Sequence, residues 1–577
     1  MSAEPKGMSP DRSGMSEQAT LSRNTVDPIA VEVIGKQLLA AAEEMGVVLV
    51  KSSYSTNIKE RQDCSTAILD PQGRTVAQAE HIPIHLGSML GLVENIARRF
   101  PLDTIKPGDL FIANDPYNGG GTHLPDITVA APFFHEGQLL AFVSNIAHHA
   151  DVGGSPAAPS DIFSEGLRIP PVRVYEAGEL RNDVLEMLLL NCRGREERLG
   201  DFRAQFAACR IGLQRLGTIY TKHGAGTVAA AIETLFDQSE RQARAAIAAL
   251  PDGFYTFEDV VDDDGVTLDP IPIRCELTVK GDQLKLDFAG TAPQVRGPIN
   301  VTDSALRATV YYVVKAVIDP TMPPNAGFYR TFEIVAPPGS IVNCRPPAPV
   351  GLRTDTCQRI VDVVLGAFFG AAPERIPAAS HSTILSVQFN GVDPRTGRYF
   401  AYPEVIAGGS GACPMMDGVD AVQVHITNTS NLPVESLEVE YPLRVERYEL
   451  VDDSGGAGRY RGGLGIRRVY RVLADGVSFR SKGDRARNAP WGLDGGLPGG
   501  LAALRMNPGQ PSERSLPFKA FNIRFDQGEL LEVITPGGGG YGDPRQRDQD
   551  ARVQDLRDAR VSPAAAQELY GSETSTR

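Results

Sequence analysis

Residues 108–149 decide the fold: GDLFIANDPYNGGGTHLPDITVAAPFFHEGQLLAFVSNIAHH. Two runs rich in apolar, β-branched and aromatic residues, 126–134 and 138–149, are typical of strands. The short link His135-Glu136-Gly137 between them predicts a tight turn, so the two runs are expected to form an antiparallel hairpin. Residues 108–115 predict a further strand, which leads into the polar loop NDPYNGGGTHLPD at 114–126.

The hairpin predicts a cluster of polar side chains at one of its ends. With a turn near residue 136, paired residues have numbers that sum to about 272, which places Asp126 opposite Ile146. His123, Asp126 and the pair His148-His149 therefore gather at the same end, on strands roughly 5 Å apart. Imidazole and carboxylate ligands suit Zn²⁺, Mn²⁺ or Fe²⁺, and such a set leaves a coordination position open for water or substrate.

Other interpretations of the same residues stay open. A loop with Asp-Pro and three glycines is most often a plain turn, and His-x-x-Asp occurs frequently by chance. Asp63, in ERQDCS, offers one more carboxylate just before a predicted strand, with Glu60 and Arg61 beside it. The remaining histidines are expected to be structural or substrate-facing (His81, His85) or buried imidazoles without a metal (His223, His381, His425).

Three consecutive glycines cost backbone entropy and contribute no side-chain packing. We hypothesise that Gly120 and Gly121 let the backbone approach the site closely and leave room for a substrate, so both are candidate substrate-binding residues. Gly120→Val is then expected to fold normally and to lose turnover.

The whole chain predicts an α+β protein of several regions with interleaved β-sheets. A disordered tail is expected over 1–24, and an N-terminal α+β region that holds the metal site over 25–180. A helical hairpin or bundle is expected over 181–250, an α+β middle region over 251–379, a β-rich region over 380–545, and short terminal helices over 546–577. Asp27 as an N-cap and Pro28 in the first turn mark the first helix.

Composition excludes several classes of protein. The 577 residues carry 57 basic and 71 acidic side chains, a net charge of −14, which disfavours nucleic-acid binding. The seven cysteines show no C-x-x-C spacing, as in reduced cytosolic proteins. The polar N-terminus lacks the apolar core of a secretory signal, and no apolar run is long enough for a membrane span. A cytoplasmic location is expected.

Nucleotide and serine-nucleophile motifs are missing from the sequence. The glycine-rich runs at 408–413, 454–468 and 536–544 lack the spacing of a phosphate loop or of a dinucleotide fingerprint. We interpret them as tight turns that let strands corner closely. G-x-S-x-G is absent, and a nucleophilic Cys64 has little support.

Several motifs in the same order resemble the hydantoinase B family. They include NDPYNGGGTHLPDI, NIAHHADVGG, PVESLEVEYPL, SGGAGRYRGGLG, GDRARNAPWGLDGG and TPGGGGYGDP, and the resemblance runs from about residue 25 to 571. This family includes subunits of ATP-dependent hydantoinases, oxoprolinases and lactamases, and the matching subunit of acetone-type carboxylases.

The resemblance implies a cyclic-amide hydrolase that depends on a metal and on ATP. A partner of the A type would bind ATP and Mg²⁺ and phosphorylate the substrate carbonyl, and water on the metal of the B-type chain would attack the activated carbon. One divalent cation, with zinc favoured over manganese or iron, would be held by Asp63, His123, Asp126 and His148. His149 would relay protons, Asp115 and Glu60 are further catalytic candidates, and Arg61 is a candidate for the substrate's carboxylate. An A₂B₂ heterotetramer is expected.

Three other functions remain as alternatives. An acetone- or acetophenone-type carboxylase subunit would join CO₂ or bicarbonate to an activated ketone. A non-haem Fe(II) oxygenase would use two histidines and one carboxylate. A scaffold that only stabilises its partner would be expected to have lost ligand residues. The compact chain favours the hydrolase over the carboxylase, and the exact substrate stays undetermined.

Overall fold

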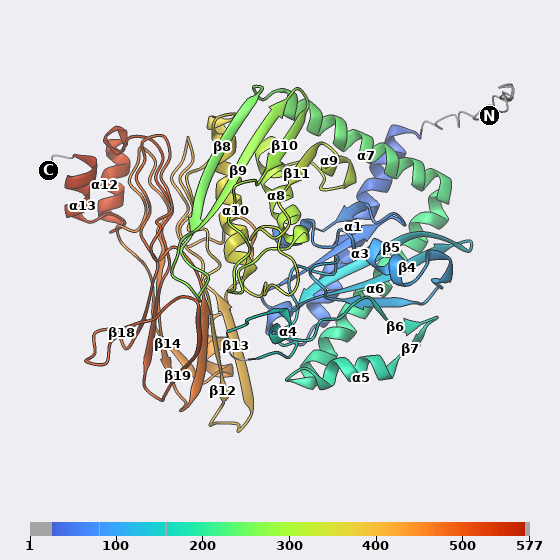
Figure 1. The fold of residues 1–577 in the computed structure, drawn as a ribbon, viewed down its shortest axis with the longest axis horizontal. Coiled ribbons are helices and arrows are strands. Elements are labelled where there is room, and N and C mark those ends of the chain that lie inside the picture. The colour runs from blue at the N-terminus through green and yellow to red at the C-terminus, as the bar shows by residue number, and fades with distance from the viewer. Residues whose placement is uncertain (1–25, 80, 156–157, 572–577) are drawn as a thin grey trace, which may run out of the picture.

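The computed structural model describes residues 26–79, 81–155 and 158–571. The tail predicted over 1–24 lies outside the described residues. The rest combines helices with four β-sheets in several regions, so the predicted multi-domain α+β class is confirmed (Figure 1). In this described part of the chain, no helix is both long and apolar enough to cross a membrane.

The N-terminal region is built on a seven-stranded antiparallel sheet in the order β2-β1-β5-β4-β3-β6-β7. Its two long central strands are the predicted hairpin. The strands are β1 (Cys64–Leu69), β2 (Thr75–Gln78), β3 (Leu110–Ala113), β4 (Asp126–His135), β5 (Gln138–His148), β6 (Val172–Glu176) and β7 (Glu179–Leu180).

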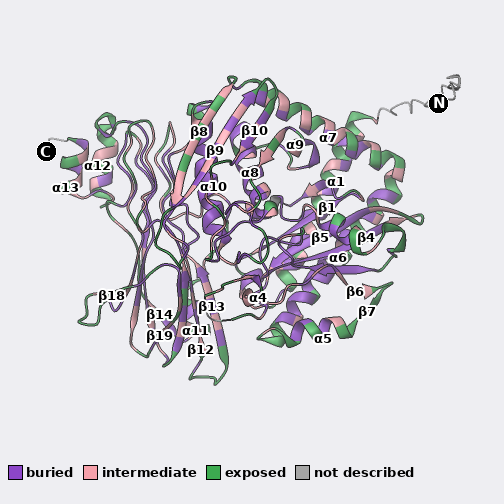
Figure 2. Cartoon of the chain, in the orientation of Figure 1, coloured by how far each residue is buried: buried purple, intermediate pink, exposed green. Residues whose placement is uncertain are grey.

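Helices cover both faces of this sheet. The long helices α1 (Pro28–Ser52) and α6 (Arg195–His223) pack on one face, where Val129 and Val143 join their core. The shorter α3 (Leu92–Arg99) packs on the other face, against Phe142 and Ile146. Because both faces are covered, β4 and β5 are buried along most of their length (Figure 2).

The N-terminal signals of the first helix are confirmed. The Asp27 side chain accepts a hydrogen bond from the backbone N–H of Ile29, and Pro28 occupies the first helical position. Further short helical segments lie in this region together with α3: α2 (Thr56–Lys59), α4 (Ile162–Glu165) and the 3₁₀ turns Pro83–Leu86 and Leu102–Thr104.

The helical segment does not form a separate bundle. Its helices are α5 (Asn182–Leu190), α6 and α7 (Ala225–Ala248). Phe202 and Phe206 of α6, and Phe236 of α7, share one hydrophobic core with the N-terminal sheet and α1. The segment is therefore the outer layer of the N-terminal region.

The middle region packs helices on a four-stranded sheet, β11-β10-β9-β8, in which β10 and β11 are parallel. The strands are β8 (Gly253–Val261), β9 (Ile271–Lys280), β10 (Gln283–Asp287) and β11 (Phe332–Val335). The helices are α8 (Asp303–Ile318), α9 (Ala326–Tyr329), α10 (Arg353–Phe369) and the 3₁₀ turn Pro373–Arg375. Almost every residue of α10 is buried, so this helix lies in the interior of the molecule (Figure 2).

The C-terminal region contains two antiparallel sheets, β13-β12-β16-β19 and β14-β15-β20-β17-β18, that share one core. The strands are β12 (Ser386–Val392), β13 (Tyr399–Val405), β14 (Leu443–Leu450), β15 (Ile466–Val472), β16 (Val477–Lys482), β17 (Ala503–Met506), β18 (Arg514–Ser515), β19 (Ala520–Phe525) and β20 (Leu530–Ile534). A short helix, α11 (Val434–Glu440), precedes β14.

The glycine-rich runs form a layer of extended segments, which we call the glycine layer (residues 408–413, 454–465, 490–500 and 536–542). Gly538 donates its N–H to Gly463 O (2.9 Å) and accepts from Gly456 N (2.8 Å). A Cβ on Gly538 would lie 1.9 Å from Ser410 O. Our interpretation of these runs as corner turns is therefore wrong, because their backbones stack directly on one another.

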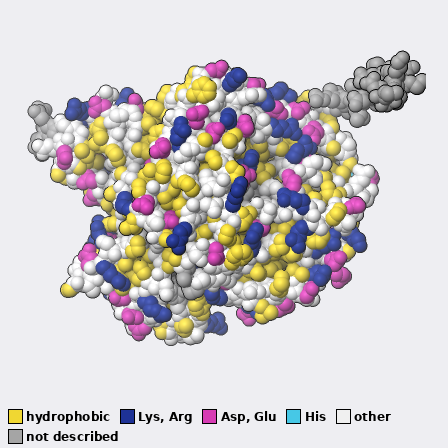
Figure 3. All heavy atoms as spheres, viewed as in Figure 1, with side chains coloured by type: hydrophobic (Ala, Val, Ile, Leu, Met, Phe, Trp, Pro, Cys, Tyr) yellow, Lys and Arg dark blue, Asp and Glu magenta, His cyan; other side chains and the backbone are white. Residues whose placement is uncertain are grey.

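The chain ends in a 3₁₀ turn (Pro544–Gln546) and two short helices, α12 (Gln549–Arg557) and α13 (Pro563–Tyr570), next to the glycine layer. On the face in Figure 3, acidic and basic side chains are interspersed.

Candidate metal centre

The hairpin places Asp126 directly opposite His148. Its turn residues Glu136 and Gly137 have φ of 49° and 79°, as a two-residue turn of this hand requires. Next to the turn, His135 pairs with Gln138, one position beyond the predicted register, and a bulge at Phe133/Phe134 shifts the pairing by one further residue. The predicted register, with Asp126 opposite Ile146, is therefore wrong by two residues, because the turn and the bulge each move the pairing by one.

His123, Asp126 and His148 form a compact group. One ligand atom from each of the three lies within 4.8 Å of the others. His123 Nε2 is 3.0 Å from Asp126 Oδ1, and the centres of the two imidazole rings are 5.0 Å apart. Two imidazoles and one carboxylate at this spacing fit Zn²⁺, Mn²⁺ or Fe²⁺.

Neighbouring side chains orient the carboxylate and one imidazole. Asp126 Oδ2 accepts hydrogen bonds from Thr122 Oγ1 (2.7 Å) and Arg353 Nη2 (2.8 Å). The Asn57 amide donates to the backbone oxygen of His148 (2.8 Å) and lies 3.0 Å from His148 Nδ1. Such outer contacts fix the orientation of metal ligands and tune their basicity.

The protonation states also suit a cation. Burial lowers the pKa of His123 to about 3 and that of His148 to about 4, and the Arg353 charge contributes to both shifts, so both imidazoles are neutral at pH 7. Burial by itself would raise the pKa of Asp126, but His123 and Arg353 outweigh it and hold this pKa well below its usual value. His123 Nδ1 is buried without a hydrogen-bond partner among the described residues.

Asp63 lies beside this group. Its backbone oxygen accepts the His148 N–H (3.0 Å), but its carboxylate does not belong to the set of atoms within 4.8 Å. Burial raises the pKa of Asp63, His85 lowers it, and Asp126 raises it. His85 is buried, with Nδ1 3.0 Å from Ser65 Oγ, so it belongs to the surroundings of the site.

Two predicted catalytic carboxylates have other partners. Asp115 is buried in a two-point ion pair with Arg168, at 2.9 and 2.8 Å, and also accepts from Asn118. Glu60 is exposed at the end of α2, where its charge adds to the burial that raises the pKa of Glu440. The catalytic roles of Asp115 and Glu60 stay predictions, and the positions of the two carboxylates do not favour them.

His149 points away from the group. Its Nε2 is 3.0 Å from Gln205 Oε1, and its ring packs on Phe202 of α6. The Gln205 amide nitrogen donates to Ile127 O (2.8 Å) and Asn145 Oδ1 (3.0 Å), so Gln205 Oε1 must accept the proton of His149 Nε2. This contact holds the sheet to α6, and a proton relay through His149 stays a prediction without structural support.

The three predicted substrate-binding residues contact other parts of the protein. Arg61 is buried, 3.4 Å from Asn57 Oδ1 and over the Tyr402 ring. A Cβ on Gly120 would lie 3.1 Å from Asp115 N, and one on Gly121 would lie 2.6 Å from Asp126 O. The expected open space beside the glycines is thus filled by backbone, because the loop folds tightly on itself.

Sequence reasoning missed the residues that complete the site. Arg353 lies 227 positions after Asp126, with which it pairs, and no local motif marks it. Lys482, at the end of β16, is near enough to lower the pKa of His148. Three regions therefore meet at this site: the hairpin, the start of α10 and the end of β16.

Two cavities of the described chain lie away from this group. One of about 680 Å³ is lined by residues of β14 and β15 and by residues 558–560, and one of about 200 Å³ lies beside His81 and Tyr312. Neither is lined by the group at the hairpin end, so the donor atoms and their charges identify the site.

Residues 27–544 match the hydantoinase B/oxoprolinase family, and the chain belongs to this family. The resemblance in the sequence motifs is thereby confirmed. The family comprises B-type subunits of ATP-dependent hydantoinases, oxoprolinases and lactamases.

Three relatives illustrate the range of the family and fold. The B component of a putative D-/L-hydantoinase from Pseudomonas sp. (strain NS671) is 35% identical over 95% of each chain. The beta chain of caprolactamase from Pseudomonas jessenii is 32% identical over 95% of this chain and 96% of its own. The crystal structure of that ATP-dependent caprolactamase matches with a TM-score of 0.88 over 95% and 96% of the two chains. Nucleotide-free acetone carboxylase shares the fold, with a TM-score of 0.87, 21% identity and coverage of 94% and 79%.

Proposed function

We propose that this chain is the metal-dependent, B-type component of an ATP-dependent cyclic-amide hydrolase, which opens a hydantoin, 5-oxoproline or lactam ring. The main support is the buried group His123, Asp126 and His148, in which two neutral imidazoles face one ionised carboxylate. The relatives' names support the reaction class, since they are components of a hydantoinase and of a caprolactamase.

The donor set fits one divalent cation, held by His123, Asp126 and His148, with Asp63 as the additional predicted ligand. When bound, such a cation supplies Lewis acidity, which lowers the pKa of water and stabilises negative charge on oxygen. Arg353 and Thr122 hold the Asp126 carboxylate in one orientation, and Asn57 holds His148. Burial of these side chains keeps bulk water away, which strengthens every electrostatic contact.

A partner protein is needed for the activation step. A cyclic amide carbon is a poor electrophile because the nitrogen lone pair is delocalised. Phosphorylation of its oxygen removes this resonance, and we assign that step to an A-type ATPase partner that binds ATP and Mg²⁺. An A₂B₂ assembly is our expectation for the complex.

The test combines this chain with an A-type ATPase partner and supplies ATP with hydantoin, 5-oxoproline or caprolactam. Ring opening is expected with at least one substrate, to be lost on chelation and restored by Zn²⁺ or Mn²⁺. His123→Ala is expected to abolish ring opening, whereas His135→Ala, at the other end of the hairpin, is the matched control and should retain it.

Two results would contradict the proposal. Ring opening that survives both chelation and His123→Ala would remove the role of the metal. Bicarbonate-dependent ATP turnover with a ketone, without hydrolysis of any cyclic amide, would identify a carboxylase component instead.

A further inference from the structure

Lys482 brings a positive charge to the metal centre from the C-terminal region. It is the last residue of β16, and its Nζ donates to Thr354 Oγ1 at 2.6 Å. Thr354 follows Arg353, which binds Asp126. The Lys482 ammonium therefore lies at the start of α10, close to the predicted ligands.

The Lys482 ammonium has no counter-ion in direct contact. Within residues 26–79, 81–155 and 158–571, no carboxylate oxygen lies within 4.0 Å of its Nζ. Two other buried cations nearby are paired: Arg359 with Asp484 (2.7 Å) and Arg485 with Asp362 (2.6 Å). An ammonium carries three N–H donors, and the bond to Thr354 uses one.

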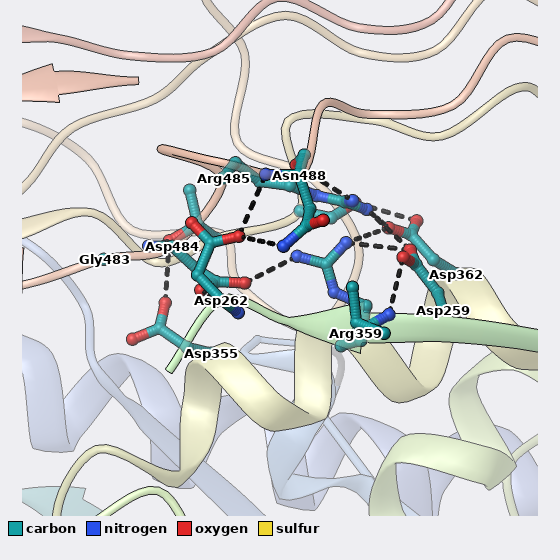
Figure 4. Close-up of polar contacts among 12 residues, drawn as sticks. Asp259, Asp262, Asp355, Arg359, Asp362, Gly483, Asp484, Arg485 and Asn488 are labelled. Atoms are coloured by element: carbon teal, nitrogen blue, oxygen red, sulfur yellow. Dashed lines mark hydrogen bonds and ion pairs between the residues drawn. The ribbon is translucent and has the colours of Figure 1, made fainter. Parts of the chain in front are cut away.

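A buried network of charges holds the backbone that follows Lys482. The residues after it, 483–488, are joined to α10 and to the end of β8 by a buried network of charges (Figure 4). Asp484 N also donates to Thr383 Oγ1 (2.9 Å). The network holds the backbone at the end of β16 against α10, which places Lys482 beside Thr354.

The charged groups that act on Lys482 come from α10, from the residue before β1 and from β4. Asp355 and Arg353 lie on α10, Asp63 precedes β1, and Asp126 begins β4. Burial lowers the pKa of Lys482 to about 8, and the Arg353 charge contributes, although the three carboxylates oppose it. Burial of the Lys482 charge is therefore unfavourable, and the three carboxylates offset it only in part.

A neutral cyclic amide does not require this charge. Once its carbonyl oxygen is phosphorylated, however, that oxygen links the reacting carbon to a phosphoryl group with two negative charges. Lysine and arginine are the usual partners of phosphoryl oxygens, with hydrogen bonds about twice as strong as neutral ones.

We propose that Lys482, supported by the charge of Arg353, binds the phosphoryl group of the activated substrate and so directs its carbon toward the metal centre. The inference rests on the proposed function. Lys482 is thus a substrate-binding residue that becomes important only after the partner has acted.

Binding of inorganic phosphate to the full chain, measured by calorimetry with and without Zn²⁺, tests this directly. Wild type is expected to bind one phosphate, and Lys482→Met to bind it at least about tenfold more weakly, since a charged hydrogen bond is lost. Lys482→Arg should retain binding up to about pH 9, where the wild-type ammonium has lost its proton. Lys36→Met, at an exposed position on α1, is the control and should match wild type.

Equal phosphate affinity in wild type and Lys482→Met, or no phosphate binding by wild type, would overturn the proposal. Tighter binding of acetate or bicarbonate than of phosphate would overturn it too. In the complete complex, Lys482→Met is expected to keep ATP hydrolysis and to lose ring opening. Failure of wild type to open any ring, with phosphate binding still dependent on Lys482, would instead contradict the proposed function alone.

Discussion

Asp126 belongs to the candidate metal centre and also contributes to local stability. It accepts from Arg353, and both side chains are at most 3% exposed. Asp126→Asn leaves the guanidinium buried without a counter-ion, which we expect to lower the free energy of unfolding by about 3–5 kcal/mol. Denaturant unfolding of the metal-free protein measures this.

The control for Asp126→Asn is Asp303→Asn, which breaks the exposed pair Asp303–Arg307. Exposed pairs contribute little, so a change within about 1 kcal/mol is expected. Comparable losses in the two variants would show that burial of the Asp126 pair does not determine its strength.

His381 is predicted to weaken the fold in acid. Burial lowers its pKa to about 3, and the neighbouring His425 contributes to this shift, so the unfolded state, with a pKa near 6.5, takes up a proton first. The stability is complete above pH 6.5 and falls as the pH drops toward 3, by about 2 kcal/mol at pH 5. His381→Gln removes the group that takes up this proton. The loss of stability relative to wild type should therefore be smaller at pH 5 than at pH 7.5, as denaturant unfolding at the two pH values would show. A difference that does not change with pH would contradict the assignment.

Residue chemistry and the predicted hairpin together brought His123, Asp126 and His148 into one group, because imidazoles and carboxylates are few and the hairpin joins them. It did not separate His148 from His149. Consecutive residues of a strand point to opposite faces, and the register decides which of them faces the site. That register depends on the exact position of the turn and on one bulge, at Phe133/Phe134, which no sequence pattern marked.

At the scale of the element, the loop between β3 and β4 is the sensitive part. Gly121 has φ of 138°, and an added Cβ would meet Asp126 O at 2.6 Å. Gly121→Ala is therefore expected to cost about 1–3 kcal/mol and to weaken Zn²⁺ binding, as calorimetry and unfolding would show. Gly217→Ala, in open space on α6, should be neutral or stabilising by up to about 1 kcal/mol. Unchanged Zn²⁺ affinity in Gly121→Ala would show that the conformation of this loop does not affect metal binding.

The elements themselves were largely predictable. The first helix and the hairpin follow from caps, turns and apolar spacing. Their packing was not: α5, α6 and α7 share the core of the N-terminal sheet, because an amphipathic helix shows which face it buries and not against which partner.

For the whole molecule, the glycine layer is the least tolerant part. Gly538→Ala would place a Cβ 1.9 Å from Ser410 O and 2.3 Å from its carbonyl carbon. Backbone cannot move aside as a side chain can, so we expect a loss of more than about 3 kcal/mol, or no folded protein. Gly226→Ala, with nothing within 4 Å, is the control. Folded Gly538→Ala with wild-type thermal stability would show that the layer is looser than these distances imply.

The sequence by itself determined the α+β class, the hairpin, the family and the residue types of the candidate metal centre, because these depend on short-range patterns and on unusual side chains. Only the tertiary structure decided the partners of Asp126, the orientation of His149 toward α6 and the place of Lys482. Arg353 and Lys482 reach the site from elements more than 200 residues away, and contacts at that separation arise from packing, which leaves no periodic trace in the chain.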